Sequence, residues 1–429
     1  MNRYARDKND AFRPAPVKRI NMDIKNTKVR IALVAFFLAV AVVSFGYFGM
    51  KDLSQEPGWK EITAQSEDGS SCASEFSLLY NLGYSGISAT AENKALTMEY
   101  TELTENAYKI FNAYESFEGV GNLHTLSKSP NEAVTVDPAL YDALELIDSY
   151  GDRGIYLAPV YQEYHNLFFC ATDAEAEAFD PFVNPEQAAM LREICGFAND
   201  PEHISLELLG DNRVKLAVSQ EYLAYAEENG IEIYLDLYWM KNAFVADYLA
   251  DHLTEKGFVL GTLSSFDGYC RVLDPSDTAY STDILDYAGS GTYKAAILQL
   301  SGPVATVSLH TYDLRGAAEK RYYKTEAGEL RFPYIDPADG LCKAAMNDLV
   351  TYTENGTCAE TLLRTVMLFV REEPEDYGLT SSLADAGTHS VYCKDHEILY
   401  TQEGAEFTEV FTSEPLSYVP RREYEQLIY

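Results

Sequence analysis

The chain has 429 residues, of which 67 are acidic and 33 are basic, so its formal net charge at pH 7 is −34. A charge of this sign and size repels nucleic acid and anionic lipid, which excludes a nucleic-acid-binding protein and a protein held tightly on an anionic lipid surface. A hydrophobic fraction of 47% with 32 tyrosines indicates a packed body and excludes a disordered stalk.

Residues 31–50, IALVAFFLAVAVVSFGYFGM, contain no charged side chain. As a helix, a segment of this length crosses about 30 Å, the thickness of the hydrocarbon core of a bilayer. Residues 1–30 carry nine basic and three acidic side chains, a net charge of +6, which leaves −40 for the rest of the chain. The sequence therefore predicts a single-pass anchor in the cell membrane, with a cytoplasmic N-terminal tail and an extracytoplasmic acidic body.

Two alternatives to this anchor are a cleaved signal peptide and a buried core helix. A signal peptide fits poorly, because the stretch before the apolar run would be unusually long, the run exceeds the usual ~7–15 residues, and no small-x-small cleavage site follows Met50. The basic flank disfavours a core helix. Cys72 lies too far beyond the apolar run to be a lipid-attachment cysteine.

The polar, turn-rich residues 51–72 are predicted to form a juxtamembrane linker, and residues 73–429 one extracytoplasmic domain. Trp59 lies either at the membrane interface or at the start of the folded domain. Apolar residues at nearly helical spacing predict a helix in 98–117. Asp137 and Pro138 are an N-cap and a first helical residue, and they begin a second helix.

Farther along, residues 204–218 form two alternating runs around Gly210-Asp211-Asn212, which predicts a hairpin. A strand, a helix and a strand in immediate succession then give the clearest α/β signal of the chain. The remaining predicted elements are a helix over 219–229, the strand–helix–strand unit 231–237, 241–256 and 258–263, paired strands at 293–300 and 304–311, a strand at 346–352 and a helix over 358–370.

The seven cysteines and seven histidines do not point to a zinc site. The cysteines include no CxxC pair, and the histidines form neither an HxH nor an HExxH pattern. The sequence also lacks the GxSxG signature of a serine hydrolase.

Five segments, in order, resemble the FAD:protein FMN transferases, the ApbE-like flavin transferases. They are 107–144, 177–185 (EAFDPFVNP, which matches a phenylalanine-aspartate-proline signature), 234–258, 332–342 (FPYIDPADGLC) and 357–370. The resemblance implies an α+β fold: a single large flavin-transferase-like domain with a mixed sheet and flanking helices, here preceded by one transmembrane helix. It also implies transfer of the FMN half of FAD to a threonine or serine hydroxyl of another exported protein, with Mg²⁺ on the pyrophosphate oxygens.

The chain departs from the family pattern where the nucleotide would bind. Asp236 is retained, but the two glycines that follow it in the family are Tyr238 and Trp239. Glycines at such positions let the backbone approach a ligand closely. Here two large aromatic side chains stand where the backbone would meet the ligand. The family's lysine aligns with Asn242, although Lys241 is adjacent.

Similar changes affect the other motifs. A Gly-Gly-Asp turn reads Ser265-Phe266-Asp267, and a Thr-Ser-Gly segment reads Thr306-Val307-Ser308. The family's histidine before Ile-Asp-Pro is Pro333, while Asp247 and Asp336 are retained.

The metal-binding helix is altered as well. Its aspartate is Glu360 and its threonine is Arg364, with Thr365 adjacent. Glutamate is one methylene longer than aspartate, and Mg²⁺ tolerates little misplacement of its ligands. Arg364 would bring a positive charge close to the metal position, where it could replace the charge of the metal but not its geometry.

The resemblance implies catalytic roles for Asp247 and Asp336 and metal-ligand roles for Glu360 and Thr365. The residues implied in binding the cofactor are Asp180, Asp236, Tyr238, Trp239, Asn242, Asp267 and Arg364. Structural alternatives stand beside these roles. Asp180 could brace a turn, Asp247 could be a favourable charge near a helix N-terminus, and Asp336 belongs to a common turn-forming dipeptide. A carboxylate such as Glu360, on an otherwise apolar helix, needs a partner or water.

Three functions follow from these features. The first is a membrane-anchored flavin transferase, with weakened Mg²⁺-dependent activity, that uses FAD to modify an exported acceptor protein. The second is a catalytically degenerate homologue that binds a nucleotide or a protein partner. The third is an anchored scaffold of a membrane complex, with an empty pocket.

Overall fold

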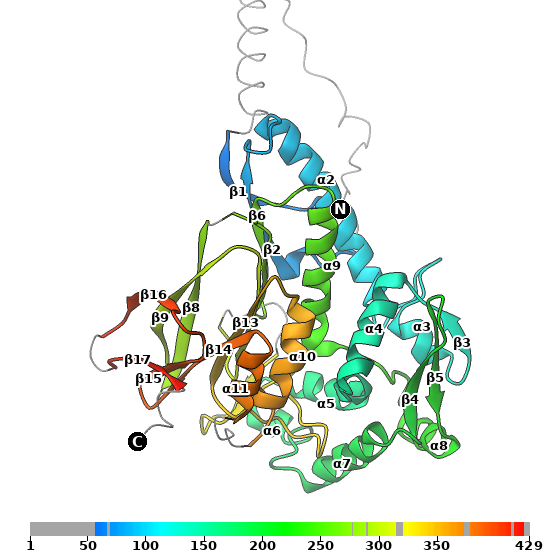
Figure 1. Ribbon diagram of the computed structural model, residues 1–429. Coiled ribbons are helices and arrows are strands. Elements are labelled where there is room, and N and C mark those ends of the chain that lie inside the picture. The colour runs from blue at the N-terminus through cyan, green and yellow to red at the C-terminus, as the bar shows by residue number, and fades with distance from the viewer. Residues whose placement is uncertain are drawn as a thin grey trace, which may run out of the picture. The chain divides into compact units, whose positions relative to one another are not determined.

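The computed structural model describes residues 56–66, 69–276, 278–288, 291–314, 321–372, 378–412 and 416–423 (Figure 1). The predicted cytoplasmic tail and the predicted transmembrane helix at 31–50 lie outside these residues. No helix within the described ranges is long and apolar enough to cross a membrane.

A nine-stranded sheet runs through the molecule in the order β1-β2-β6-β7-β10-β13-β14-β15-β17. All neighbouring strands are antiparallel except β15 and β17, which are parallel, so the sheet is mixed, as expected for the α+β fold. Its strands are β1 (Gly58–Ile62), β2 (Phe76–Leu82), β6 (Gly261–Ser265), β7 (Tyr269–Val272), β10 (Val304–His310), β13 (Asp348–Glu354), β14 (Thr388–Lys394), β15 (Glu397–Tyr400) and β17 (Val419–Arg422).

Three smaller sheets accompany it: β16-β9-β8, β3-β5-β4 and β11-β12. Their strands are β3 (Ala133–Thr135), β4 (Ile204–Leu208), β5 (Arg213–Val218), β8 (Ala279–Ala288), β9 (Gly291–Ser301), β11 (Tyr323–Lys324), β12 (Leu330–Arg331) and β16 (Glu406–Val410). The helices are α2 (Ala89–Ile110), α3 (Leu123–Lys128), α4 (Pro138–Tyr150), α5 (Ala158–Phe169), α6 (Asp173–Ala176), α7 (Pro185–Asn199), α8 (Gln220–Asn229), α9 (Lys241–Glu255), α10 (Cys358–Phe369) and α11 (Gly378–Asp385), with 3₁₀ turns η1 (Ala73–Glu75), η2 (Gly154–Leu157) and η3 (Tyr238–Met240).

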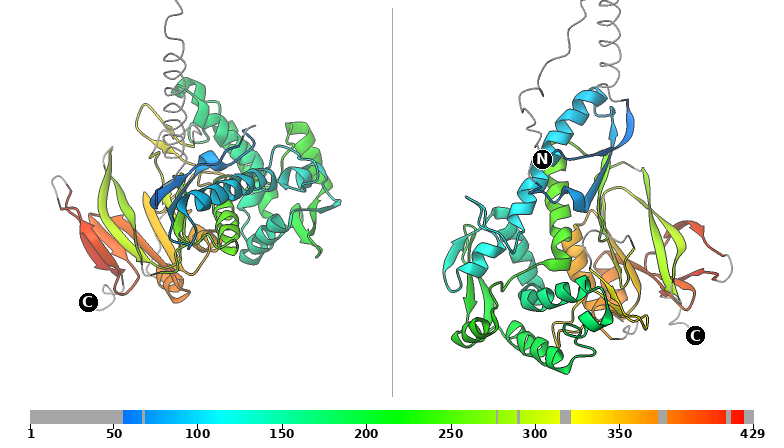
Figure 2. Two further views of the ribbon diagram at one scale, coloured as in Figure 1. Left: turned by 90° about the horizontal axis from the view of Figure 1, so that it is seen from above. Right: turned by 180° about the vertical axis from the view of Figure 1, so that it is seen from behind.

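Two apolar cores lie on the central sheet. The larger core forms where α9 packs against α2 and α10 and where these helices meet the strands, and Figure 2 shows α2 and α9 next to one another. The smaller core joins the β16-β9-β8 sheet to the central sheet through residues such as Leu298, Val350 and Val391. The alternation of buried residues along β2 is typical of a strand with one face on a core.

Local signals placed several elements correctly. Asp137 caps α4 by accepting a hydrogen bond from the Ala139 N–H, with Pro138 as the first helical residue. The hairpin at Gly210 is β4–β5, and α8, α9, α10 and β13 lie within two residues of their predicted bounds.

The helix predicted in 98–117 is α2, and it ends earlier, at Ile110. The Asn112 side chain accepts hydrogen bonds from the N–H groups of Tyr114 and Glu115, and this turn takes the place of further helix.

The strand–helix–strand prediction was wrong in its first strand. Residues 231–237 form no strand, because several of their N–H groups bind other partners. Those of Tyr234 and Leu235 donate to the Ser127 hydroxyl, and that of Asp236 donates to the Ile155 carbonyl. The second strand, β6, begins at Gly261, three residues later than predicted, and pairs antiparallel with β2 and β7.

The strands predicted at 293–300 and 304–311 exist, but their predicted pairing was wrong. β9 belongs to the three-stranded sheet and β10 to the central sheet. Residues 304–307 of β10 are buried on both faces, which suits an interior strand, whereas β9 alternates between buried and less buried residues.

Part of the predicted linker is also folded, since residues 58–62 form β1 at the edge of the sheet. Trp59, whose position the sequence left open, lies in this strand and contacts the ring of Tyr280 edge to face.

Candidate ligand-binding site

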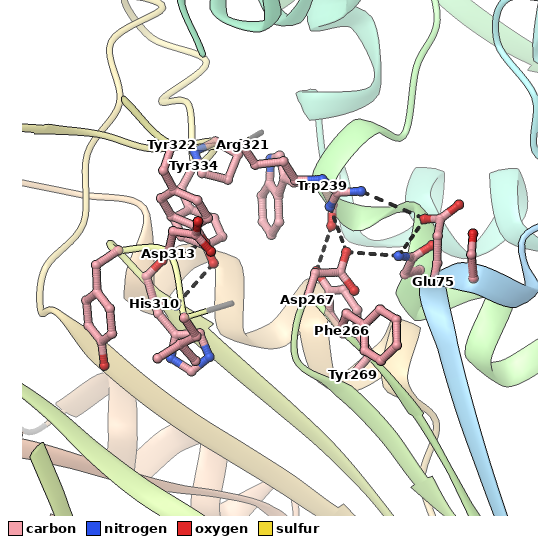
Figure 3. A pocket seen from close by; sticks show the side chains of 15 residues that line it. Glu75, Trp239, Phe266, Asp267, Tyr269, His310, Asp313, Arg321, Tyr322 and Tyr334 are labelled. Atoms are coloured by element: carbon pink, nitrogen blue, oxygen red, sulfur yellow. Dashed lines mark hydrogen bonds and ion pairs between the residues drawn. The ribbon is translucent and has the colours of Figure 1, made fainter. Parts of the chain in front are cut away.

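Residues from three of the family-like motifs meet at one cavity of about 180 Å³, called here the Trp239 cavity (Figure 3). Trp239 comes from η3, Asn242 from the first turn of α9, Asp267 from the β6–β7 turn and Pro333 from the loop after β12. The full lining is Ser74, Glu75, Trp239, Asn242, Phe266, Asp267, Tyr269, His310, Tyr312, Asp313, Leu314, Arg321, Tyr322, Pro333 and Tyr334.

The backbone at Tyr238 has a conformation typical of glycine. Its φ angle is +45°, which L-residues other than glycine, asparagine and aspartate adopt rarely. The resemblance aligned this position with the first of two family glycines. The Tyr238 ring stacks on the ring of Tyr161 with centroids 4.7 Å apart, and this contact helps to hold the strained residue in place.

Trp239 forms an aromatic wall of the cavity. Its side chain is buried, and its indole lies edge to face with the ring of Tyr334 at 5.0 Å. The Tyr269 hydroxyl donates to the Trp239 carbonyl at 2.8 Å. The indole Nε1–H is buried and has no hydrogen-bond partner among the described residues, although such groups are almost always paired.

Opposite charges meet on one side of the cavity (Figure 3). Glu75 accepts from the Lys241 ammonium at 3.0 Å and from the Asn242 amide at 2.9 Å, and Arg321 lies 3.9 Å away. Burial alone would raise the pKa of Glu75, but Lys241 and Arg321 hold it below its ordinary value. Asp267 accepts from Arg321 at 2.7 Å and from the Asn242 amide at 3.0 Å.

Two hydrogen-bond acceptor atoms of this group have no partner among the described residues. Because the Asn242 Nδ2 group donates to two carboxylates, the orientation of its amide is fixed. Asn242 Oδ1 and Asp267 Oδ1 are both buried, and neither has a hydrogen-bond partner within the part of the chain that the structure describes.

The opposite wall carries a histidine that the sequence analysis did not single out. His310 Nδ1 lies 3.1 Å from Asp348 Oδ1, and the Tyr312 hydroxyl donates to the same oxygen. The His310 N–H donates to the Tyr334 hydroxyl at 3.1 Å, and its carbonyl accepts from the Tyr322 hydroxyl at 3.1 Å. In the sequence, His310 and Asp348 each lie near the end of a predicted strand. This pattern identifies them as neighbours only once the two strands are known to pair.

Asp236 and Tyr238 line a second pocket of about 370 Å³, beside α2 and α5. The Tyr114 hydroxyl donates to Asp236 at 2.7 Å, and the Tyr238 N–H donates to its other oxygen at 2.8 Å. Burial raises the pKa of Asp236 despite these bonds. Lys241 and Arg321 also line this pocket.

Asp247 lies outside both cavities, at the N-terminus of α10. Its carboxylate accepts hydrogen bonds from the N–H groups of Cys358 (2.8 Å) and Ala359 (2.7 Å) and pairs with Arg271. It therefore satisfies N–H groups that a helix leaves free at its N-terminus. The sequence alternative of a charge at a helix N-terminus fits this geometry, although the helix is α10 and not the residue's own.

Asp180 and Asp336 also bind neighbouring groups of the fold. Both oxygens of buried Asp180 lie 3.0 Å from Arg331 Nε, and the arginine covers the ring of Phe182. Asp336 accepts from its own turn, at the Ala338 N–H, and from Lys343 at 2.8 Å. Neither aspartate lines the two cavities.

Glu360 and Arg364 form an ion pair one turn apart on α10, and Arg364 also donates to the Ala386 carbonyl and the Thr388 hydroxyl. Tyr150 donates to Glu360 as well. Thr365 is fully buried, with its hydroxyl between the Thr361 carbonyl and the Thr351 hydroxyl.

These oxygens do not fit a Mg²⁺ site. Those of Asp247, Asp336 and Glu360 already accept from cationic groups or from N–H groups, and a hard cation needs several carboxylate or carbonyl oxygens that converge. No group of three or more His, Cys, Asp or Glu residues within the described ranges could hold a metal ion. The metal-ligand roles of Glu360 and Thr365 stay predictions of the sequence.

A planar apolar ring suits the Trp239 cavity better than a pyrophosphate does. Much of the lining is aromatic, with Trp239, Phe266, Tyr269, Tyr312, Tyr322 and Tyr334 among its residues. Among the described residues of the lining, Glu75, Asp267 and Asp313 stand against Arg321, a net charge of −2, which Lys241, bound to Glu75, brings to −1. That charge opposes a phosphate group.

Comparisons with known proteins place the fold. No protein-family model matches the chain, and no curated protein matches its sequence. An ApbE protein of Thermotoga maritima has a similar structure, with a TM-score of 0.52, 14% identity, and coverage of 82% of this chain and 97% of that chain. The flavin transferase ApbE from Vibrio cholerae gives a TM-score of 0.53, 15% identity, and coverage of 82% and 98%. The matches cover nearly the whole length of both solved structures, so this chain has the fold of the ApbE flavin transferases.

Proposed function

We propose that this chain is an ApbE-fold protein that binds a flavin-type ring in the Trp239 cavity and does not carry out Mg²⁺-dependent transfer of FMN. The observation that carries the proposal is where the structure places two groups of motif residues. Three of the motif residues implied in cofactor binding, Trp239, Asn242 and Asp267, line one cavity. The two implied metal ligands, Glu360 and Thr365, are bound to other groups of the fold.

The chemistry of the cavity supports a ring without phosphate. Trp239 and Tyr334 give it flat apolar walls on which a planar ring can lie. The net negative charge around the cavity disfavours the phosphates of FMN and FAD relative to uncharged riboflavin. The expected order of affinities therefore has riboflavin above FMN and FAD. A transferase that acts on FAD would not show this order.

Flavin transfer is the second candidate, and the fold favours it. The two solved structures compared above, with TM-scores of 0.52 and 0.53, are ApbE proteins, and one is described as a flavin transferase. On this alternative the chain would take FAD and Mg²⁺ and would modify a threonine or serine of an exported acceptor protein.

We also propose that the protein acts at the outer face of the cell membrane. The charge-free residues 31–50 and the +6 tail support a single anchor with the folded body outside. Protease added to intact cells should then degrade the body and spare the tail. A body that is protected until the membrane is permeabilised would reverse the orientation.

The binding experiment uses the full chain, purified in detergent. Calorimetry should show riboflavin binding more tightly than FMN or FAD. Since the chain has two tryptophans, a Trp59→Phe background isolates the emission of Trp239, which riboflavin should quench. Trp239→Leu should abolish binding, while Trp59→Phe should retain it, because Trp59 lies in β1 and not in the cavity lining.

The same protein is then incubated with FAD, Mg²⁺ and an exported protein that carries an acceptor threonine. We expect no covalent flavin on the acceptor. Covalent labelling would establish the transferase instead, and the absence of binding to all three flavins would leave the scaffold function.

A further inference from the structure

His310 occupies a wall of the Trp239 cavity with one ring nitrogen already committed. Nδ1 lies 3.1 Å from Asp348 Oδ1. A carboxylate only accepts hydrogen bonds, so the proton of a neutral His310 resides on Nδ1 and Nε2 is left as an acceptor. Within the described residues Nε2 has no hydrogen-bond partner, and His310 lines the cavity.

Tyr312 strengthens this assignment. Its hydroxyl donates to the same oxygen of Asp348. Burial, together with the nearby Asp348 charge, raises the pKa of Tyr312 far above its ordinary value, so the hydroxyl keeps its proton and stays a donor. Two donors therefore converge on Asp348, whose side chain is only 6% exposed.

The position of the imidazole is fixed along with its proton. His310 pairs directly with Asp348 across β10 and β13. Its N–H and its carbonyl are bound by the hydroxyls of Tyr334 and Tyr322 on the two sides of the backbone. A fixed acceptor discriminates between ligands better than a mobile one, because little entropy is lost on binding.

The other unpaired atoms of the cavity define what a ligand must offer. Asn242 and Asp267, which line the cavity, each have a buried acceptor oxygen (Oδ1) without a hydrogen-bond partner among the described residues, beside the acceptor His310 Nε2. A ligand that leaves a buried acceptor unpaired loses the free energy of that bond, so the cavity favours a ring that carries an N–H group.

We propose that His310 Nε2 accepts a hydrogen bond from a ring N–H of the bound ligand, and that the ligand class is a planar heteroaromatic ring with an imide or lactam edge. This inference rests on the proposed function and makes it specific. In riboflavin the matching group is the imide N3–H between its two carbonyls. His310 is then a specificity-determining residue, and Asp348 acts as its positioning residue.

The test compares riboflavin with 3-methylriboflavin, which lacks the N3–H, on the full chain in detergent. Wild-type protein should bind riboflavin about tenfold more tightly, the effect of one buried hydrogen bond. In His310→Phe the two flavins should bind equally, and His310→Gln, whose amide oxygen can accept, should restore part of the preference. His252→Phe is the matched control, because His252 binds the Tyr248 carbonyl on α9 and does not line the cavity. It should keep the tenfold ratio.

A second measurement determines the tautomer of His310 directly in the wild-type protein. The ¹⁵N spectrum of wild-type His310, recorded with the ring in its neutral form at alkaline pH and assigned by its loss in His310→Gln, should show Nδ1 protonated and Nε2 unprotonated. Equal binding of the two flavins by wild-type protein, a ratio retained in His310→Phe, or a proton on Nε2 would overturn this inference and leave the proposed function intact. No binding of either flavin would overturn both.

Discussion

His310 and Asp348 face each other directly across the antiparallel pair of β10 and β13, and their side chains meet on the cavity side of the sheet. A shift of one residue in the register of either strand would turn one of the two side chains to the opposite face. The buried residues of β10, such as Val307 and Leu309, oppose Thr351 and Leu349 in the same register. The packing that fixes the strands thus also fixes the imidazole.

The strained backbone at Tyr238 gives a prediction about stability. Both Tyr238→Gly and Tyr238→Ala lose the stacking contact with Tyr161, at a cost of about 2–3 kcal/mol for a partly buried ring. Glycine adopts a φ angle of +45° without strain and alanine does not, so the glycine variant should be about 1 kcal/mol more stable than the alanine variant. Urea unfolding of the full chain measures the difference.

Tyr248, in the middle of α9, is the matched control for this pair of variants. There the order should reverse, with alanine about 1 kcal/mol more stable than glycine, because the backbone is helical. If Tyr238→Ala proves as stable as Tyr238→Gly, the backbone of the native protein is not held in the glycine conformation.

The buried ion pair of Asp180 and Arg331 gives a second prediction. The two side chains are 3% and 5% exposed, and the carboxylate holds the guanidinium through both of its oxygens. Asp180→Asn should lower the free energy of unfolding by about 3–5 kcal/mol, because it leaves a buried charge without its main partner. Flavin affinity should not change, since neither residue lines the Trp239 cavity.

The double variant Asp180→Leu, Arg331→Met tests the cause. Replacing both charges by apolar groups should cost less than Asp180→Asn alone. A double variant that is less stable than the single one would show that the pair stabilises the fold in its own right.

The elements that the sequence predicted well are those with strong local signals. Asp137 and Pro138 begin α4, and Gly257, with a positive φ, follows α9. These signals act within a few residues of the chain, so they work without knowledge of the tertiary structure. Residues 231–237 failed for the opposite reason, because the partners of their N–H groups, Ser127 and Ile155, lie about a hundred residues away in sequence.

The candidate site likewise combines residues that local motifs identified with residues that only the tertiary structure brings close. Trp239, Asn242 and Asp267 were selected from motifs, and the structure brings them to one cavity. Their partners Glu75 and Arg321 come from distant segments without a motif, and no local pattern marks them. His310 was missed because it depends on the pairing of β10 with β13, and the sequence had suggested β9 as the partner of β10.

Asp247 gives a prediction about pH. Burial raises its pKa to about 6, although Arg271 and two N–H groups of α10 favour the charged form. The unfolded chain has an ordinary value near 4. Between these values the folded protein binds more protons than the unfolded chain, so stability from this group is fully present below about pH 4 and is lost as pH rises through 6.

The comparison of wild type with Asp247→Asn isolates that effect, because the other titrating groups are common to both. The stability of the wild type relative to the variant should fall by about 2 kcal/mol between pH 4 and pH 7, as followed by urea unfolding. A difference that grows with pH would mean that Arg271 and the helix N–H groups outweigh burial, and that the pKa of Asp247 is lowered.

The last prediction concerns Mg²⁺ and the ion pair of Glu360 and Arg364. Glu360 is 37% exposed, so Glu360→Gln should change the free energy of unfolding by less than about 1 kcal/mol. If Arg364 supplies the only cation that Glu360 binds, Mg²⁺ should not raise the Tm of the wild type, and a chelator should not weaken riboflavin binding. A bound metal would raise the Tm in proportion to the logarithm of its concentration.

Glu403→Gln is the matched control, because Glu403 also pairs with an arginine, Arg422, at the surface and is far more exposed. It should match Glu360→Gln in its small effect on stability and in its indifference to Mg²⁺. The variant Glu360→Asp, Arg364→Thr carries the residue types that the resemblance places at both positions. A rise of Tm with Mg²⁺ in this variant alone would show that these two substitutions closed a metal site on α10. A rise in the wild type that disappears in Glu360→Gln would make Glu360 a metal ligand and would favour the transferase over the binding protein.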